Sequence, residues 1–168
     1  MVVFLYIGRG AGKTTNALGL ALRCVGHGLK VIVIQFMKGR KDIGEYKIRE
    51  RLAPEYEIYQ FGRPEFVDLE NPSEEDRDLA RKGLLFAREC LKRRPHLLVL
   101  DELALACYVG LVSTEEVLKL LDEVPEGTDV VITGRYAPPE LIDRADVVNM
   151  IVEVKYPRET YNRIGINW

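Results

Sequence analysis

A glycine-rich segment near the N-terminus ends in a lysine and two threonines. Its residues are Gly8, Arg9, Gly10, Ala11, Gly12, Lys13, Thr14 and Thr15. The backbone N–H groups of such a loop can surround a phosphate, and the positive end of a following helix adds further attraction. Lys13 would place an ammonium beside the outer phosphates, and the Thr14 hydroxyl can reach a Mg²⁺ held by them. The spacing therefore predicts a site for the phosphates of a nucleotide.

The residues around this loop predict the elements that must position it. Residues 2–7 are all apolar or aromatic and predict a buried strand, and residues 16–28 carry apolar side chains at helical spacing. In the usual phosphate-loop pattern the first glycine would fall at Ile7, whereas the glycines here stand at 8, 10 and 12. A glycine-rich turn without a ligand is the alternative, but strand, loop, lysine and helix in this order favour phosphate binding.

Two carboxylates, Asp101 and Glu102, follow a hydrophobic strand predicted at residues 96–100. Carboxylate oxygens suit Mg²⁺, and either residue could hold the ion directly or through water, completing the shell that Thr14 begins. A solvated strand end is the alternative, because acids are common there. With the phosphate loop upstream, the metal role is favoured.

Other side chains could contact a ligand, and each has an ordinary alternative. Arg135 follows a predicted strand at residues 129–133 and could pair with a phosphate or with charge developing on a leaving group. A surface ion pair with Asp143 or Glu140 is equally compatible with the sequence. Arg23, on the first helix, could be a surface cation or could contact a ribose or base. Three aromatic residues could form an apolar wall for a flat ligand or pack in the core: Phe61, Phe66 and Tyr108.

Predicted strands and helices alternate along the chain. Further strands are expected at residues 30–36, 55–61 and 147–154, and helices at 45–52, 73–94, 113–123 and 140–144, with capping residues at Ser73 and Ser113. This alternation predicts a single α/β domain over residues 1–168, with three layers around a mainly parallel sheet. Because ligands of such sheets bind beyond the carboxyl ends of the strands, the loops at 8, 35–39, 101 and 134 should share one edge.

Composition narrows the class of protein. The chain has 168 residues, of which 47% are hydrophobic and 30% charged, as expected for one globular domain. A net charge of −2 gives no general attraction to nucleic acid or an anionic membrane. The cysteines are isolated at 24, 90 and 107, no apolar run has membrane-spanning length, and the chain starts directly at a strand without signal-peptide features. We expect a cytoplasmic protein that binds neither nucleic acid nor membranes.

Together these motifs resemble those of the ATP:corrinoid adenosyltransferases, which make adenosylcobalamin in bacteria and archaea. The matching stretches are GRGAGKTTNALGLALRCVGHG, VIVIQFMKG, LLVLDEL and VVITGRYAPPELIDRADVV, and KYP…IGINW is similar to the family's closing segment. The resemblance covers nearly the whole chain, and LALRCVGHG followed by QFMKG is far more specific than the phosphate loop. The family's loop has the form G-x-G-x-G-K-T-T, which accounts for the unusual glycine spacing.

The resemblance implies a RecA-like fold of the P-loop NTPase class, usually a homodimer. It implies that Co(I) of a corrinoid attacks C5′ of ATP and that inorganic triphosphate leaves, with a flavoprotein as a candidate electron donor. Since cobalt is the nucleophile, no protein base is needed. The work of the protein is to position C5′ and to stabilise the leaving triphosphate. Lys13, Glu102 and Arg135 would be the catalytic residues, and Thr14, Asp101 and Glu102 would hold Mg²⁺.

The resemblance also assigns the rest of the site. The loop from Gly8 to Thr15 would hold the triphosphate, Arg23 would contact the nucleoside, and Phe61 and Phe66 would lie against the corrin, where they displace its lower ligand. The sequence departs from the family at Ala11, where many members have a lysine, and at Tyr156, where a histidine is usual. Many members also carry an N-terminal segment that helps to cover the active site.

Three other functions remain compatible with the same motifs. One is a kinase or NTPase in which the basic loop from Lys38 to Lys41 closes over phosphates. The second is a relative that binds ATP without adenosylating corrinoids. The third is a RecA-like module that uses ATP to act on a protein or nucleic acid. The products separate the first from adenosyl transfer, because a kinase forms ADP and adenosyl transfer releases intact triphosphate.

Overall fold

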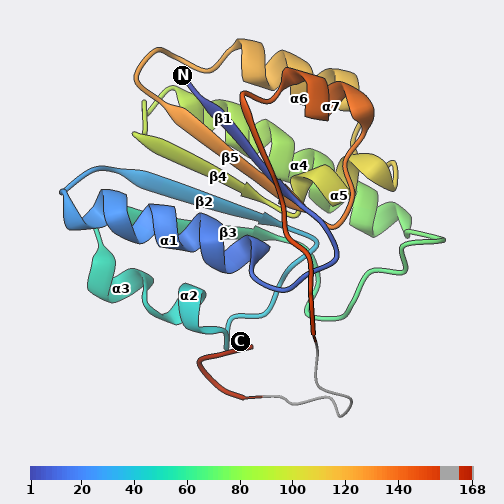
Figure 1. The fold of residues 1–168 in the computed structure, drawn as a ribbon, viewed down its shortest axis with the longest axis horizontal. Coiled ribbons are helices and arrows are strands. Elements are labelled where there is room, and N and C mark those ends of the chain that lie inside the picture. The colour runs from blue at the N-terminus through green and yellow to red at the C-terminus, as the bar shows by residue number, and fades with distance from the viewer. Residues whose placement is uncertain (156–162, 168) are drawn as a thin grey trace.

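Parallel strands form a sheet through the centre of the molecule (Figure 1). The computed structural model describes residues 1–155 and 163–167, and within them the sheet has six strands in the order β3-β2-β4-β5-β1-β6. Their bounds are β1 Val3–Ile7, β2 Val31–Phe36, β3 Tyr56–Phe61, β4 Leu97–Asp101, β5 Asp129–Gly134 and β6 Val147–Met150. All of the strand pairs are parallel, so every carboxyl end lies at the same edge.

Helices cover both faces of this sheet. They are α1 Lys13–Gly26, α2 Gly44–Lys47, α3 Arg49–Leu52, α4 Glu74–Leu91, α5 Leu103–Tyr108, α6 Thr114–Asp122 and α7 Pro139–Arg144. One core cluster joins α1 to the sheet, and the other joins the sheet to α4, α5 and α6 on the opposite face. The central strands β2 and β4 are buried along their whole length because both faces are covered, which is why they read as almost continuous apolar runs. The predicted three-layer α/β fold is confirmed.

Hydrogen bonds fix the helices where the sequence predicts caps. The Ser73 side chain accepts from the Asp76 N–H, and the Asp76 carboxylate accepts in return from the Ser73 N–H, so both donors are satisfied at the start of α4. Ser113 and Glu116 form the same reciprocal arrangement at α6. The described residues include no helix with the length and apolarity that a bilayer crossing needs.

The structure differs from the expected elements in three places. Helix α5 follows β4 at once and was not predicted, because its sequence LALACY is too uniformly apolar to show a helical period. The helix expected at 45–52 consists of two short ones, α2 and α3. The last strand ends at Met150 rather than at 154, because Met150 pairs with Ile7, where β1 itself ends. The Ile151 N–H still donates to the carbonyl oxygen of Ile7.

Candidate active site

The glycine loop lies between β1 and α1 at the carboxyl edge of the sheet (Figure 1). Gly8 and Gly12 have φ values of 113° and 110°, which disfavour any other residue. A Cβ atom at Gly8 would lie 2.3 Å from the carbonyl oxygen of Ile151, and the Gly10 N–H donates to that same oxygen over 3.0 Å. Gly8 and Gly10 are therefore also required by the segment after β6, which lies closely against the loop.

Polar groups of the protein already engage this loop. The Ala11 N–H donates to Oε1 of Glu153 over 3.0 Å, and Lys13 Nζ donates to the carbonyl oxygen of Gly10 over 2.7 Å. Burial lowers the pKa of Lys13, while the carboxylate of Glu102 opposes that shift. A triphosphate that binds here must therefore replace a carboxylate at Ala11 and draw the Lys13 ammonium away from its own loop.

The Asp101 carboxylate accepts four side-chain hydrogen bonds at this edge. Its Oδ1 accepts from the hydroxyls of Thr14 over 2.8 Å and Thr133 over 2.7 Å. Its Oδ2 accepts from Gln35 Nε2 over 3.1 Å and Lys38 Nζ over 2.7 Å. Burial opposes ionisation, but the Lys38 ammonium and these hydrogen bonds prevail and hold the pKa of Asp101 below its usual range. The alternative of a solvated strand end is wrong for Asp101, because this residue is completely buried.

Glu102 has an unusual backbone and an unsatisfied carboxylate. Its φ is 64°, in the left-handed region that non-glycine residues rarely adopt, and its N–H donates to the Thr133 hydroxyl over 2.9 Å. Its Oε2 is buried and has no hydrogen-bond partner within residues 1–155 and 163–167. Burial raises the pKa of Glu102. Strain and an orphaned acceptor at one residue are features of a ligand site.

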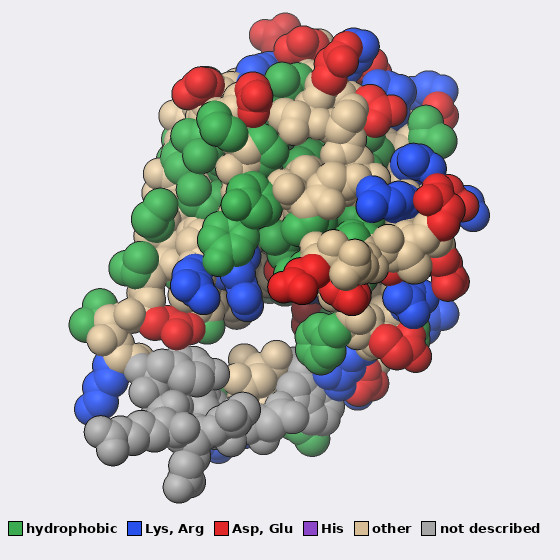
Figure 2. All heavy atoms as spheres, turned by 90° about the vertical axis from the view of Figure 1, so that its right-hand side faces the viewer, with side chains coloured by type: hydrophobic (Ala, Val, Ile, Leu, Met, Phe, Trp, Pro, Cys, Tyr) green, Lys and Arg blue, Asp and Glu red, His purple; other side chains and the backbone are tan. Residues whose placement is uncertain are grey.

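A cavity of about 240 Å³ joins these groups to the loop that follows β3. Its charged walls are Lys13, Lys38, Glu102 and Arg135, and its apolar walls include Phe66. Phe66 is 100% exposed, so its ring packs against nothing in the described structure. Figure 2 shows this edge of the molecule, where Lys and Arg side chains lie beside a patch of hydrophobic side chains. The cavity thus offers both phosphate-binding charge and an apolar surface.

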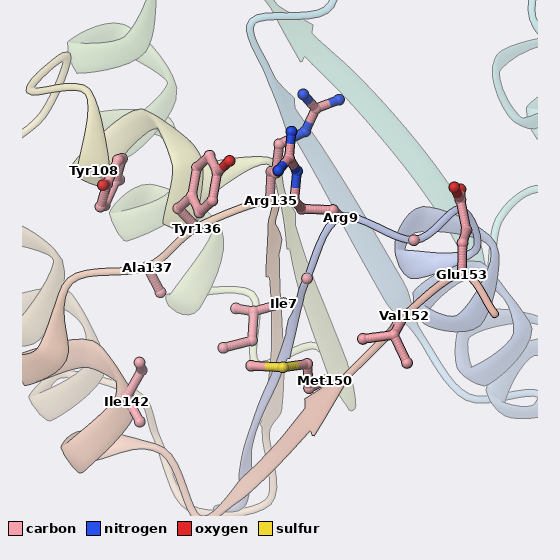
Figure 3. A pocket seen from close by; sticks show the side chains of 12 residues that line it. Ile7, Arg9, Tyr108, Arg135, Tyr136, Ala137, Ile142, Met150, Val152 and Glu153 are labelled. Atoms are coloured by element: carbon pink, nitrogen blue, oxygen red, sulfur yellow. The ribbon is translucent and has the colours of Figure 1, made fainter.

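A second cavity, of about 540 Å³, lies on the other side of Arg135 (Figure 3). Arg9 and Arg135 line it together with Tyr108 and Tyr136, whose ring centroids are 5.0 Å apart. Within the described residues Arg135 makes no ion pair with the acids of α7, so that surface pairing is not observed. Arg135 is instead exposed and lines both cavities.

The structure does not bring every candidate residue into the cavity that Lys13, Glu102 and Arg135 line. Arg23 lies in the last turn of α1, ten residues after Lys13, which is about 15 Å of helix. Phe61 packs against Phe86 on α4, with ring centroids 5.4 Å apart. This contact agrees with the alternative that Phe61 packs in the core. Tyr108 lines the second cavity, so it forms no common wall with the other two aromatic residues. Tyr156 lies outside the described residues.

Several residues of the site were not assigned from the sequence. Gln35 is the single polar residue of β2, and Thr133 is the single polar residue in the buried part of β5, which was the signal that could have identified them. Lys38 belongs to a loop that was expected at this edge, but its contact with Asp101 was not foreseen. Glu153 lies in a stretch expected to be strand, and nothing in its spacing links it to Ala11.

The arrangement of oxygens suits Mg²⁺ bound together with phosphates. Thr14 and Asp101 present a hydroxyl and a carboxylate at hydrogen-bond distance from each other, and Glu102 has a free carboxylate oxygen. These are the hard oxygen ligands that Mg²⁺ prefers. Within the described residues no group of three or more His, Cys, Asp or Glu side chains could hold a metal by itself. Phosphate oxygens would have to complete the shell.

Solved structures of low sequence identity share the fold. The genome packaging NTPase B204 of Sulfolobus turreted icosahedral virus 2, in complex with AMPPCP, matches with a TM-score of 0.58 at 14% identity. The match covers 92% of this chain and 76% of that one. The complex of the same NTPase with AMP matches with a TM-score of 0.57 at 13% identity and the same coverage. The likeness places the chain in the NTPase fold class.

Sequence relatives identify the family. The corrinoid adenosyltransferase of Escherichia coli K12 is 34% identical over 157 residues, which span 92% of this chain and 78% of that protein. The corrinoid adenosyltransferase of Pseudomonas aeruginosa is 32% identical over 158 residues, 92% of this chain and 76% of that protein. The family model described as ATP:corrinoid adenosyltransferase BtuR/CobO/CobP matches residues 1–168. The chain therefore belongs to the ATP:corrinoid adenosyltransferase family.

Proposed function

We propose that this protein transfers the 5′-deoxyadenosyl group of ATP to Co(I) of a corrinoid and releases inorganic triphosphate. The match of the family model to residues 1–168 carries the proposal. The site agrees with it in one chemical respect. The charged walls of the cavity suit a leaving polyphosphate, and the proposed reaction requires no nucleophile–base pair of the protein. A reaction whose nucleophile is the substrate's own cobalt needs no such pair.

Stabilisation of the leaving triphosphate is the work we assign to the phosphate loop. The N–H groups of residues 8–15 and the Lys13 ammonium would bind its oxygens, and Arg135 would offset charge at the C5′ end. Thr14 and Asp101, with Glu102 nearby, would hold Mg²⁺, which supplies further charge neutralisation when it is bound. These groups act best where water is excluded, because charge–charge interactions are stronger in a low dielectric.

The corrinoid would lie against the loop that follows β3. Phe66, Val67 and Leu69 line the same cavity as Glu102 and form part of its apolar surface. Arg63 anchors the start of this loop by donating to both carboxylate oxygens of Asp76, over 3.0 and 3.1 Å. A flat macrocycle would bury the exposed ring of Phe66, and burial of apolar area favours such a contact. We extend the proposal to a homodimer and to a flavoprotein that supplies the electron for Co(I).

The test is an anaerobic incubation of the protein with ATP, Mg²⁺ and chemically reduced cob(I)alamin. The expected result is an absorbance change that marks the new cobalt–carbon bond and is reversed by light. Lys13→Ala serves as the control, since it removes one phosphate contact without touching the proposed corrin surface. If wild-type protein binds ATP but forms no light-sensitive product, the proposal is wrong, and the formation of ADP would then indicate a kinase.

A further inference from the structure

The Lys38 ammonium lies between the two oxygens that are candidates for Mg²⁺. Lys38 Nζ is 2.7 Å from Oδ2 of Asp101 and 3.1 Å from the hydroxyl oxygen of Thr14, and that hydroxyl is 2.8 Å from Oδ1 of Asp101. Mg²⁺ contacts its ligands at about 2.0–2.1 Å. An ammonium and a metal ion therefore cannot both contact these two oxygens at the same time.

The backbone places Lys38 there. Met37 has a φ of 56°, in the left-handed region, which turns the chain sharply at the end of β2. The loops after β2 and β3 are in close contact. A Cβ at Gly39 would lie 2.4 Å from the carbonyl oxygen of Gly62, and a Cβ at Gly62 would lie 2.3 Å from the backbone nitrogen of Lys38. Because neither loop can shift without meeting the other, the position of Lys38 is specified by the fold.

At this position the Lys38 ammonium compensates the negative charge of Asp101. Asp101 is a buried carboxylate, and a buried charge without a compensating partner is strongly destabilising. Within residues 1–155 and 163–167, Lys38 is the only cation that forms an ion pair with Asp101. The side chain of Lys38 is 29% exposed, so it can leave toward the cavity without crossing the core.

We propose that Lys38 is the resident cation of the magnesium site: its ammonium occupies the site in the nucleotide-free protein, and Mg²⁺–ATP displaces it. The proposal rests on the function proposed above only in taking Mg²⁺–ATP as the ligand. The displaced ammonium stays in the same cavity, which Lys38 lines with Lys13 and Glu102. There it meets phosphate oxygens and the unpartnered carboxylate oxygen of Glu102.

This exchange would also link the two halves of the site. The backbone nitrogen of Lys38 lies against Gly62, and Gly62 begins the segment that carries Phe66.

The experiment uses the divalent cation alone, without ATP or corrinoid. Lys38→Met leaves Asp101 and Thr14 without their cation, so we expect it to bind Mn²⁺ at least tenfold more tightly than wild type in an electron paramagnetic resonance titration. Its melting temperature should lie below that of wild type and should recover on addition of Mg²⁺, whereas the wild-type melting temperature should not respond. Lys41→Met, on the exposed part of the same loop, is the matched control and should behave as wild type.

Two further variants keep the result interpretable. Lys38→Gln retains a hydrogen-bond donor without the charge and should also gain Mn²⁺ affinity, while Lys38→Met combined with Asp101→Asn should lose the gain. Folded Lys38 variants that bind Mn²⁺ no better than wild type would overturn the proposal. So would variants that fail to fold at every Mg²⁺ concentration, because a displaceable cation must be replaceable by the metal. Because the assay contains neither ATP nor corrinoid, its outcome does not depend on whether the protein catalyses adenosyl transfer.

Discussion

Thr133 connects the two acidic residues of the site, and its replacement by valine tests whether the structure assigns the right contacts. Its hydroxyl donates to Asp101 over 2.7 Å and accepts from the Glu102 N–H over 2.9 Å. Valine fills nearly the same volume but can do neither. Thr133→Val therefore removes one hydrogen bond to a buried carboxylate and leaves a backbone donor unsatisfied.

The size of the effect follows from these two losses. A hydrogen bond to a charged group contributes about 1.5–3 kcal/mol, and an unsatisfied buried donor costs about 1–3 kcal/mol. Because the two losses share one site and are not additive, we expect the free energy of unfolding to fall by about 3 kcal/mol. For a chain of this size that corresponds to a decrease of about 6–12 °C in melting temperature.

The assay is urea denaturation of Thr133→Val beside Thr128→Val. Thr128 is equally buried, and its hydroxyl donates to the carbonyl oxygen of Pro95 over 2.6 Å, away from the site. That control leaves the buried Pro95 carbonyl oxygen without this donor, so it should lose about 1–3 kcal/mol, but it should keep its activity. Thr133→Val should lose adenosyl transfer at least tenfold at a temperature where it is folded, since Glu102 loses the bond that holds its strained backbone. A Thr133 variant within about 0.5 kcal/mol of wild type would refute this reading of the site.

Three further predictions concern the surroundings of the site. Glu153→Gln should bind ATP several-fold more tightly in calorimetry, because it weakens the acceptor at the Ala11 N–H and removes a negative charge beside the triphosphate. Unchanged or weaker binding would contradict competition between the Glu153 carboxylate and the triphosphate for this N–H. Lys13→Ala should bind ATP about 10–100-fold more weakly, the equivalent of one charge-assisted hydrogen bond, and an affinity near wild type would remove the phosphate-loop assignment. Hydrogen bonds from Arg63 and Ser73 lower the pKa of Asp76 to about 2, so this carboxylate stabilises the fold above about pH 4 and the contribution is lost as the pH falls toward 2. Arg63→Ala should therefore lower the free energy of unfolding more at pH 7 than at pH 2.5 in urea denaturation, with Arg81→Ala as the exposed control, and a cost independent of pH would exclude the ion pair as its cause.

The fold was predictable because its strands are buried on both faces. Runs such as VIVIQF and LLVLD can be read without knowing their neighbours, since burial alone dictates them. Helix α5 could not be read, because a short helix enclosed in the core shows no polar face. The end of β6 depends on where its partner β1 ends, which is a property of the pairing and not of residues 151–154 themselves.

The site was predictable where residues adjacent in sequence are expected to bind the same ligand. The phosphate loop and the pair at 101–102 are contiguous in sequence, so their residue types reveal them. Lys38 and Thr133 reach Asp101 only because β2 and β5 flank β4, an order that one sequence does not disclose. Arg23 lies in the last turn of α1, and its contact with a nucleoside remains a prediction.

The fate of the phosphates tests the central claim most directly. Phosphorus NMR of the anaerobic reaction should show one equivalent of inorganic triphosphate for each adenosylated corrinoid, and its formation should require both cob(I)alamin and Lys13. ADP and orthophosphate in place of triphosphate, or triphosphate that forms without a corrinoid, would contradict attack of cobalt on C5′ and with it the account given for this site.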